Sequence, residues 1–77
     1  MFDITILSPR REVFEGQAES VFLPGDEGEF EILEMHRTIL SLLTEGEIII
    51  DGQLRIPIKS GVINFNDGRL VGLVEEE

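Results

Sequence analysis

The sequence predicts a small all-β domain, a flattened antiparallel β-sandwich or barrel of about ten short strands. Apolar and polar residues alternate over short runs, which is typical of strands with one buried face. Turn-forming pairs such as Asp51-Gly52 and Asp67-Gly68 separate these runs every roughly six to ten residues. The whole chain, residues 1–77, has the length of one domain with a single core.

The N-terminal stretch predicts two strands joined by a charged turn. Phe2–Leu7 alternates between apolar and polar residues, and Ser8-Pro9 ends the strand because proline has no N–H to donate. The apolar residues on one face of this strand are Phe2, Ile4 and Ile6. After Arg10-Arg11-Glu12, a second strand begins at Val13-Phe14. Gly16 indicates a bulge or a tight corner within it.

A third strand is predicted from Ala18 to Leu23, and its composition is unusual for a sheet with one wet face. Val21-Phe22-Leu23 is apolar at every position, so both faces of the strand carry apolar side chains. A strand at a crowded corner of a sandwich would show this pattern, and so would a strand with one face covered by a partner. The sequence leaves both interpretations open.

A hairpin is predicted at Asp51-Gly52, because a type I′ turn needs positive φ at both central positions. Its two strands are Glu47–Ile50 and Leu54–Lys59. A two-residue loop would pair Ile49 with Leu54, whereas one added loop residue would reverse the faces, and the sequence fits either register. Pro57 indicates an edge position or a bulge, because proline cannot donate to a ladder.

A second hairpin is predicted near the C-terminus. Ser60-Gly61 is expected to turn the chain, so that a separate strand starts at Val62. The two strands of the hairpin are Val62–Asn66 and Arg69–Val74. A turn at Asp67-Gly68 places Phe65 opposite Leu70, a favourable cross-strand apolar pair.

The central stretch, from Leu23 to Leu43, has two local interpretations. Apolar residues recur at helical spacing from Glu31 to Thr44, and Gly46 could end such a helix. The strands and turns on both sides favour strand, loop and strand instead, because tertiary context often overrides local propensity. Periodicity alone does not decide between them.

Composition excludes several classes of function. The chain has a net charge of −10 and no basic cluster larger than Arg10-Arg11, which disfavours binding to nucleic acid or anionic lipid. It has no cysteine and one histidine, so we expect no disulfide and no structural zinc. No apolar run approaches the ~18–20 residues of a membrane span. We therefore expect a soluble, intracellular protein that does not insert into a membrane directly.

Catalytic chemistry is not indicated. His36 is the only imidazole, and neither Ser41 nor any third group is placed to form a nucleophilic pair with it. A structural or contact role for His36 is favoured over catalysis. The acidic residues from Asp26 to Glu31 lack the spacing of a calcium loop, so they indicate a solvated turn or a partner contact. We expect no enzyme activity, no cofactor and no metal site.

Several stretches, in order along nearly the whole chain, resemble the ε subunit of F-type ATP synthases. Arg10–Gly16 is similar to that family's "EREVFSGE", and Pro24–Leu33 to its "PGxEGELGIL". His36 falls at the histidine of "PGHAPLL", Ser60–Phe65 is similar to "SGGFLEV", and Arg69–Val74 to the final strand "VTVLA". No single motif is decisive, and the assignment depends on their colinear order.

The resemblance implies the family's N-terminal ten-stranded flattened sandwich and a non-catalytic role in the rotor, or central stalk. In the family this domain binds the γ subunit on one side and the membrane c-ring on the other, at the cytoplasmic side of the bacterial inner membrane. The positions that match the family's ring-facing residues, and are candidate c-ring contacts here, are Asp26, Glu27, Glu29 and His36. The alternative is a stand-alone small β-sandwich that binds or regulates another protein.

The sequence departs from the family pattern in two places. Glu34-Met35 and Arg37-Thr38 replace Pro-Gly and Ala-Pro, so the loop from Glu34 to Thr38 can accommodate a short helical turn. Typical members continue into a helical hairpin that regulates ATP hydrolysis and in some cases binds ATP. The present sequence ends at Glu77 without a "DxxRA"-like motif, so we expect neither self-inhibition nor ATP binding.

Overall fold

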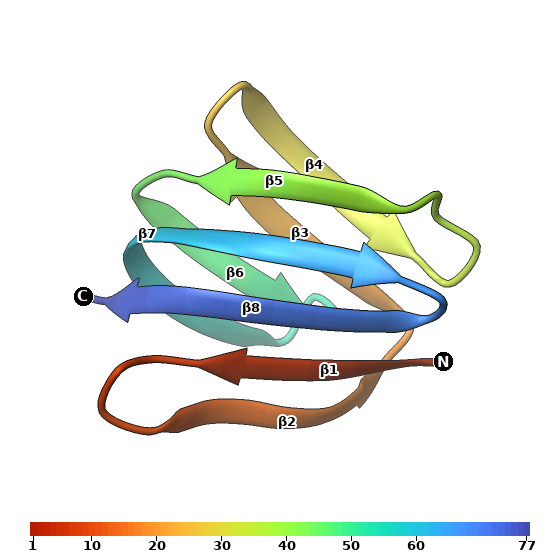
Figure 1. Cartoon of the computed structure of the whole chain (residues 1–77), viewed down its shortest axis with the longest axis horizontal. Coiled ribbons are helices and arrows are strands. Elements are labelled where there is room, and N and C mark those ends of the chain that lie inside the picture. Colours follow the sequence, from red (N-terminus) through yellow and green to blue (C-terminus); the bar gives the residue numbers. More distant parts are fainter.

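The computed structural model describes all 77 residues, which form strands and connecting turns without a helix (Figure 1). The eight strands are β1 (Phe2–Leu7), β2 (Glu12–Ala18), β3 (Ser20–Gly25), β4 (Gly28–Leu33), β5 (Ile39–Leu43), β6 (Gly46–Ile50), β7 (Leu54–Asn66) and β8 (Arg69–Glu76). The all-β prediction is confirmed, with eight strands where about ten were expected. No helix able to cross a bilayer is present.

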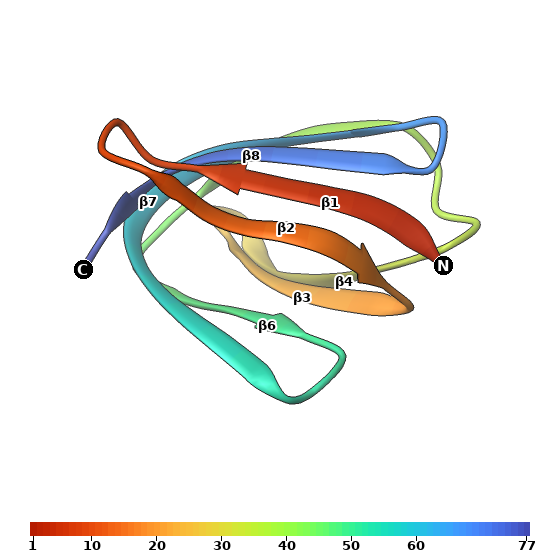
Figure 2. The same cartoon turned by 90° about the horizontal axis from the view of Figure 1, so that it is seen from below.

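The strands pack as two layers that share β7 (Figures 1 and 2). The first layer contains β2, β1, β8, the C-terminal half of β7, and β5; the second contains the N-terminal half of β7, then β6, β3 and β4. All pairings are antiparallel except that of β1 with β8. β2 pairs only with β1 and β4 only with β3, so each of these strands has one open edge; the start of β7 pairs only with β6, and β5 meets β3 only at Leu43.

The expected chain reversal at Ser60-Gly61 does not occur. β7 is one strand of 13 residues that bends from the second layer into the first (Figure 2), and its register against β8 shifts between Ile58 and Ser60. Small residues permit the bend, because a Cβ on Gly61 would lie 2.9 Å from the carbonyl oxygen of Leu73. Pro57 lies just before the shift, which agrees with the prediction of an edge position or a bulge.

The structure decides the register of both hairpins. At the β6–β7 turn, Ile50 pairs with Leu54, so the loop has the additional residue and Ile48 and Ile50 face the core. Asp51 and Gly52 have φ angles of 54° and 67°, as a type I′ turn requires. At the β7–β8 turn, Phe65 pairs with Leu70, and that prediction is confirmed.

The core between the layers is entirely apolar. It contains sixteen buried residues, and no polar or charged side chain is buried with them. The expected face of β1 (Phe2, Ile4 and Ile6) is part of it. Phe2 and Phe65 meet edge to face with ring centroids 5.3 Å apart. Without buried polar groups, the position of each strand is specified by apolar alternation and by turn geometry.

The central stretch is strand, turn and strand, and the helical turn at Glu34–Thr38 does not form. The backbone N–H of His36 donates to the carbonyl of Leu33 at 3.0 Å, which closes a β-turn around Glu34 and Met35. β4 and β5 are already paired with β3 and β7, respectively. The five remaining residues are too few to offset the cost of nucleating a helix.

The bulge expected at Gly16 lies earlier in β2. Gly16 pairs regularly with Ile4, whereas the register shift falls where Ile6 pairs with Phe14 and Leu7 with Glu12, leaving Val13 as the extra residue. The absent side chain of Gly16 has a packing explanation instead, because a Cβ there would lie 3.3 Å from the ring of Phe14.

The carboxylate of Asp51 joins two separate corners of the fold. It accepts hydrogen bonds from the backbone N–H groups of Glu19 (2.8 Å) and Ser20 (3.1 Å), and its own N–H donates to the carbonyl of Ser20 (2.9 Å). The turn between β2 and β3 is thereby fixed to the turn between β6 and β7.

We predict that Asp51→Ala lowers the free energy of unfolding by about 1–2 kcal/mol more than Asp67→Ala does. The two aspartates have nearly the same backbone conformation, with φ angles of 54° and 53°, so the strain of a left-handed alanine is common to both. Only Asp51 bonds to a distant turn. Urea denaturation followed by circular dichroism measures the difference, and equal losses would contradict the role given to the Asp51 carboxylate.

Candidate interaction surfaces

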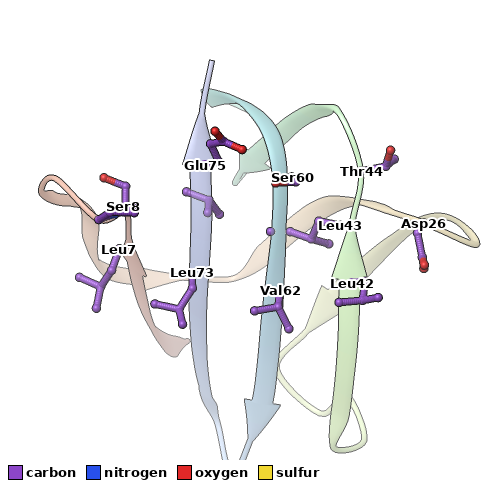
Figure 3. A pocket seen from close by; sticks show the side chains of 13 residues that line it. Leu7, Ser8, Asp26, Leu42, Leu43, Thr44, Ser60, Val62, Leu73 and Glu75 are labelled. Atoms are coloured by element: carbon purple, nitrogen blue, oxygen red, sulfur yellow. The ribbon is translucent and has the colours of Figure 1, made fainter.

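The outer face of the first layer carries a row of aliphatic side chains across four neighbouring strands (Figure 3). Leu42 of β5 pairs with Val62 of β7, Val62 with Leu73 of β8, and Leu73 with Leu7 of β1. We call these four residues the apolar row. Leu42 is 60% exposed and Leu73 is 55% exposed, whereas Leu7 and Val62 are half-buried. Leu40, 71% exposed, extends the apolar surface along β5.

The apolar row exists because three strands are apolar on both faces. Leu43, Ile63 and Val74 point into the core, and their neighbours Leu42, Val62 and Leu73 therefore point out. The row lines an open groove of about 910 Å³. A contiguous aliphatic surface on a domain with 29% charged residues is a candidate site for the binding of another molecule.

Sequence reasoning did not find the apolar row. Its one residue from β5, Leu42, lies in the stretch whose spacing resembled a helix, and the other three lie on separate strands that the sequence could not place side by side. The usable signal was the unbroken apolar pairs Leu42-Leu43, Val62-Ile63 and Leu73-Val74.

Phe22, singled out in the sequence, lies on the outer face of the second layer. Val21 and Leu23 on either side of it are fully buried, as a sandwich strand requires. The ring of Phe22 is half-buried, and Ile49 is its cross-strand neighbour on β6. The apolar run therefore belongs largely to the fold.

The four candidate c-ring contacts are distributed along one edge of the sandwich. Asp26 and Glu27 form the β3–β4 turn, and Glu29 is exposed on β4. His36 follows the other end of β4, a strand of six residues that spans roughly 20 Å. The groove between β4 and β5 is lined by Asp26 and Glu27 at one end and by His36 at the other. We call these four residues the polar edge.

His36 is attached to the core more firmly than the sequence indicated. Its ring is half-buried and meets the ring of Phe65 edge to face, with centroids 6.1 Å apart. Its Nδ1–H donates to the carbonyl of Arg37 at 2.7 Å. The hydroxyl of Ser41 donates instead to the carbonyl of Leu42, so the two side chains form no catalytic pair. No group of three metal-ligating side chains is found in the structure.

Two further contacts hold the loop that carries His36. The N-terminal ammonium of Met1 lies 2.7 Å from a carboxylate oxygen of Glu34, and this hydrogen bond raises the pKa of the amino group. The hydroxyl of Thr38 donates to the side-chain oxygen of Asn66 at 3.2 Å. The β4–β5 loop is thereby linked to the N-terminus and to the β7–β8 turn.

Comparison with known proteins identifies the relatives of this chain. Residues 1–76 match the family model described as the β-sandwich domain of the ATP synthase delta/epsilon chain. The ATP synthase epsilon chain of Nitratiruptor sp. is 40% identical over 76 residues, which cover 94% of this chain and 59% of the relative. That of Aquifex aeolicus is 35% identical and covers 99% and 59%. The chain thus spans less than two thirds of the length of these relatives.

Solved structures share the fold. A chain in the central stalk/c-ring structure of Tetrahymena thermophila mitochondrial ATP synthase superposes with a TM-score of 0.78 at 15% identity, over 96% of this chain and 63% of that one. A chain in the Euglena gracilis mitochondrial ATP synthase structure gives the same TM-score at 20% identity, over 95% and 49%. At these identities the likeness establishes the two-layer sandwich.

We predict that His36→Ala lowers the free energy of unfolding by roughly 1 kcal/mol, because it removes the edge-to-face contact with Phe65. Glu29→Ala should change it by less than ~0.5 kcal/mol, since Glu29 is exposed and makes no side-chain hydrogen bond or ion pair. Chemical denaturation of both variants measures the free energy of unfolding. An unchanged value for His36→Ala would contradict a stabilising role for the ring and leave only a contact with a partner.

Proposed function

Because this chain belongs to the β-sandwich family of ATP synthase delta/epsilon chains, we propose that it is a non-catalytic central-stalk subunit of an F-type ATP synthase. In this role it joins the γ subunit to the membrane c-ring and turns with them. It lies at the cytoplasmic side of the bacterial inner membrane, where the complex holds it. ATP synthesis and the coupled ion transport occur on other subunits.

The observation that carries this proposal is the presence of two different exposed surfaces on one apolar core. The apolar row lies on the outer face of the first layer, and the polar edge runs along β4 from the β3–β4 turn to His36. A subunit that joins two partners needs two surfaces that can be occupied together. The close-packed sandwich supports a role in transmitting force, because its interior is apolar throughout.

The chemistry of each surface favours one partner. Exposed leucine and valine side chains gain from burial against another protein, at roughly 25 cal/mol per Å² of apolar area removed from water, so the apolar row suits a permanent contact with γ. The polar edge carries carboxylates and an imidazole, groups that bind polar loops. Loops that connect the c subunits at the membrane surface offer such a partner.

We predict that the two contacts can be removed separately. Leu73→Asp should weaken binding to γ at least about thirtyfold, because it places a carboxylate in a buried apolar contact. Glu29→Lys should weaken association with the c-ring about three- to tenfold and leave γ binding unchanged. Titration of γ and of detergent-solubilised c-ring with each variant measures both affinities.

Leu54→Asp is the matched control for the apolar substitution, since Leu54 is 44% exposed but lies outside the apolar row. It should leave both affinities unchanged. If Leu73→Asp has the native circular dichroism spectrum and binds γ with unaltered affinity, the apolar row is not the γ-binding surface. Failure of the unsubstituted chain to bind either γ or the ring would refute the proposed function itself.

A further inference from the structure

The groove over the first layer has two parallel sides of different chemistry (Figure 3). One side is the apolar row. The other is a polar rim of three residues that line the same groove. Ser60 on β7 and Glu75 on β8 lie two positions from Val62 and Leu73 and so point the same way. Thr44 directly follows the end of β5, two positions from Leu42. The surface is therefore amphipathic across the strands.

The charges in the groove have one sign. Asp26 lies at its β5 end, where the backbone N–H of Asp26 donates to the carbonyl of Leu42 at 3.0 Å. Glu75 lies on the rim, and these two carboxylates are the only charged residues that line the groove. No lysine or arginine contributes to the lining, and the whole chain has a net charge of −10. A complementary partner therefore brings cations to this rim.

The dimensions of the groove fit a helix. The apolar row crosses four strands, and three spacings of ~4.8 Å give a length of roughly 14 Å. An α-helix of about ten residues has the same length. Such a helix, with an apolar stripe and a polar stripe beside it, matches the parallel row and rim.

We propose that this groove binds a basic amphipathic helix of a partner subunit, which lies across β5, β7, β8 and β1. The apolar stripe of the helix covers the apolar row, and its lysine or arginine side chains reach Asp26 and Glu75. Asp26 then serves this groove rather than the c-ring contact. The inference deepens the proposed function, on which it rests for naming γ as the source of the helix.

The test uses two synthetic helical peptides of equal length and periodicity, one of leucine and lysine and one of leucine and glutamate. Calorimetric titration into the 77-residue chain should show one-to-one binding of the leucine–lysine peptide and none of the leucine–glutamate peptide. Leu73→Asp should weaken that binding at least about tenfold. Leu42→Asp, on a different strand, should weaken peptide binding to a similar extent. It replaces Leu73→Asp as the test variant if Leu73→Asp does not fold.

Asp26→Asn and Glu27→Gln form the matched pair that separates a specific contact from attraction by net charge. Both remove one negative charge from the same turn, but only Asp26 lines the groove over the apolar row. Asp26→Asn should weaken peptide binding about three- to tenfold, and Glu27→Gln by less than ~twofold. Equal effects of the two substitutions, or equal binding of the two peptides, would overturn the proposal.

Competition with γ distinguishes this inference from the proposed function. We expect γ to displace the leucine–lysine peptide. Binding of γ without displacement would overturn the groove assignment and leave the central-stalk role standing. If the chain binds the leucine–lysine peptide specifically but does not bind γ, the groove is supported as a helix site and the proposed function is contradicted.

Discussion

The close passage of β7 beside β8 at Gly61 is the constraint on which the rest of the structure depends. A side chain on this residue would meet the carbonyl oxygen of Leu73 at 2.9 Å and Val74 at 3.0 Å, so only glycine allows the two strands this approach. Here β7 leaves one layer for the other: it pairs with β8 from Ile58 onward, and its pairing with β5 begins at Gly61. One strand thereby closes the sandwich and places Val62 outward beside Leu42 and Leu73.

This geometry connects the core to the surface that we assign to γ. Alternation along β5, β7 and β8 means that each core residue has an outward neighbour, and beside Leu43, Ile63 and Val74 that neighbour is an aliphatic residue of the apolar row. The register that buries Ile63 also presents Val62. A change that shifted β7 by one residue would exchange the two faces and remove the apolar row together with the core. Stability and binding therefore depend on the same strand pairings.

Local chemistry in the sequence was sufficient for much of this fold. The alternation in β1 and the turn at Asp67-Gly68 specify their own structure, and both were predicted correctly. The register at Asp51-Gly52 was not predictable from local sequence, because the turn is held by hydrogen bonds to the Asp51 carboxylate from the distant Glu19 and Ser20. Ser60-Gly61 carries the composition of a reversal, but its neighbours on β8 convert it into a bend.

The candidate surfaces were predictable in part. Residue types along the polar edge indicated a contact surface, but the packing of His36 on Phe65 joins residues 29 positions apart and leaves no local signal. The apolar row depends on strand order, which the sequence does not state. The apolar row can be recognised only when β1, β5, β7 and β8 are placed together.

The central claim is that one small sandwich uses separate surfaces for γ and for the c-ring, and methyl NMR tests it most directly. In a chain with labelled leucine, valine and methionine methyl groups, γ should perturb Leu7, Leu42, Val62 and Leu73 and leave Leu33 and Met35 near His36 unchanged. Detergent-solubilised c-ring should perturb Leu33 and Met35 and leave the apolar row unchanged. Perturbation of the same methyl groups by both partners would contradict the account.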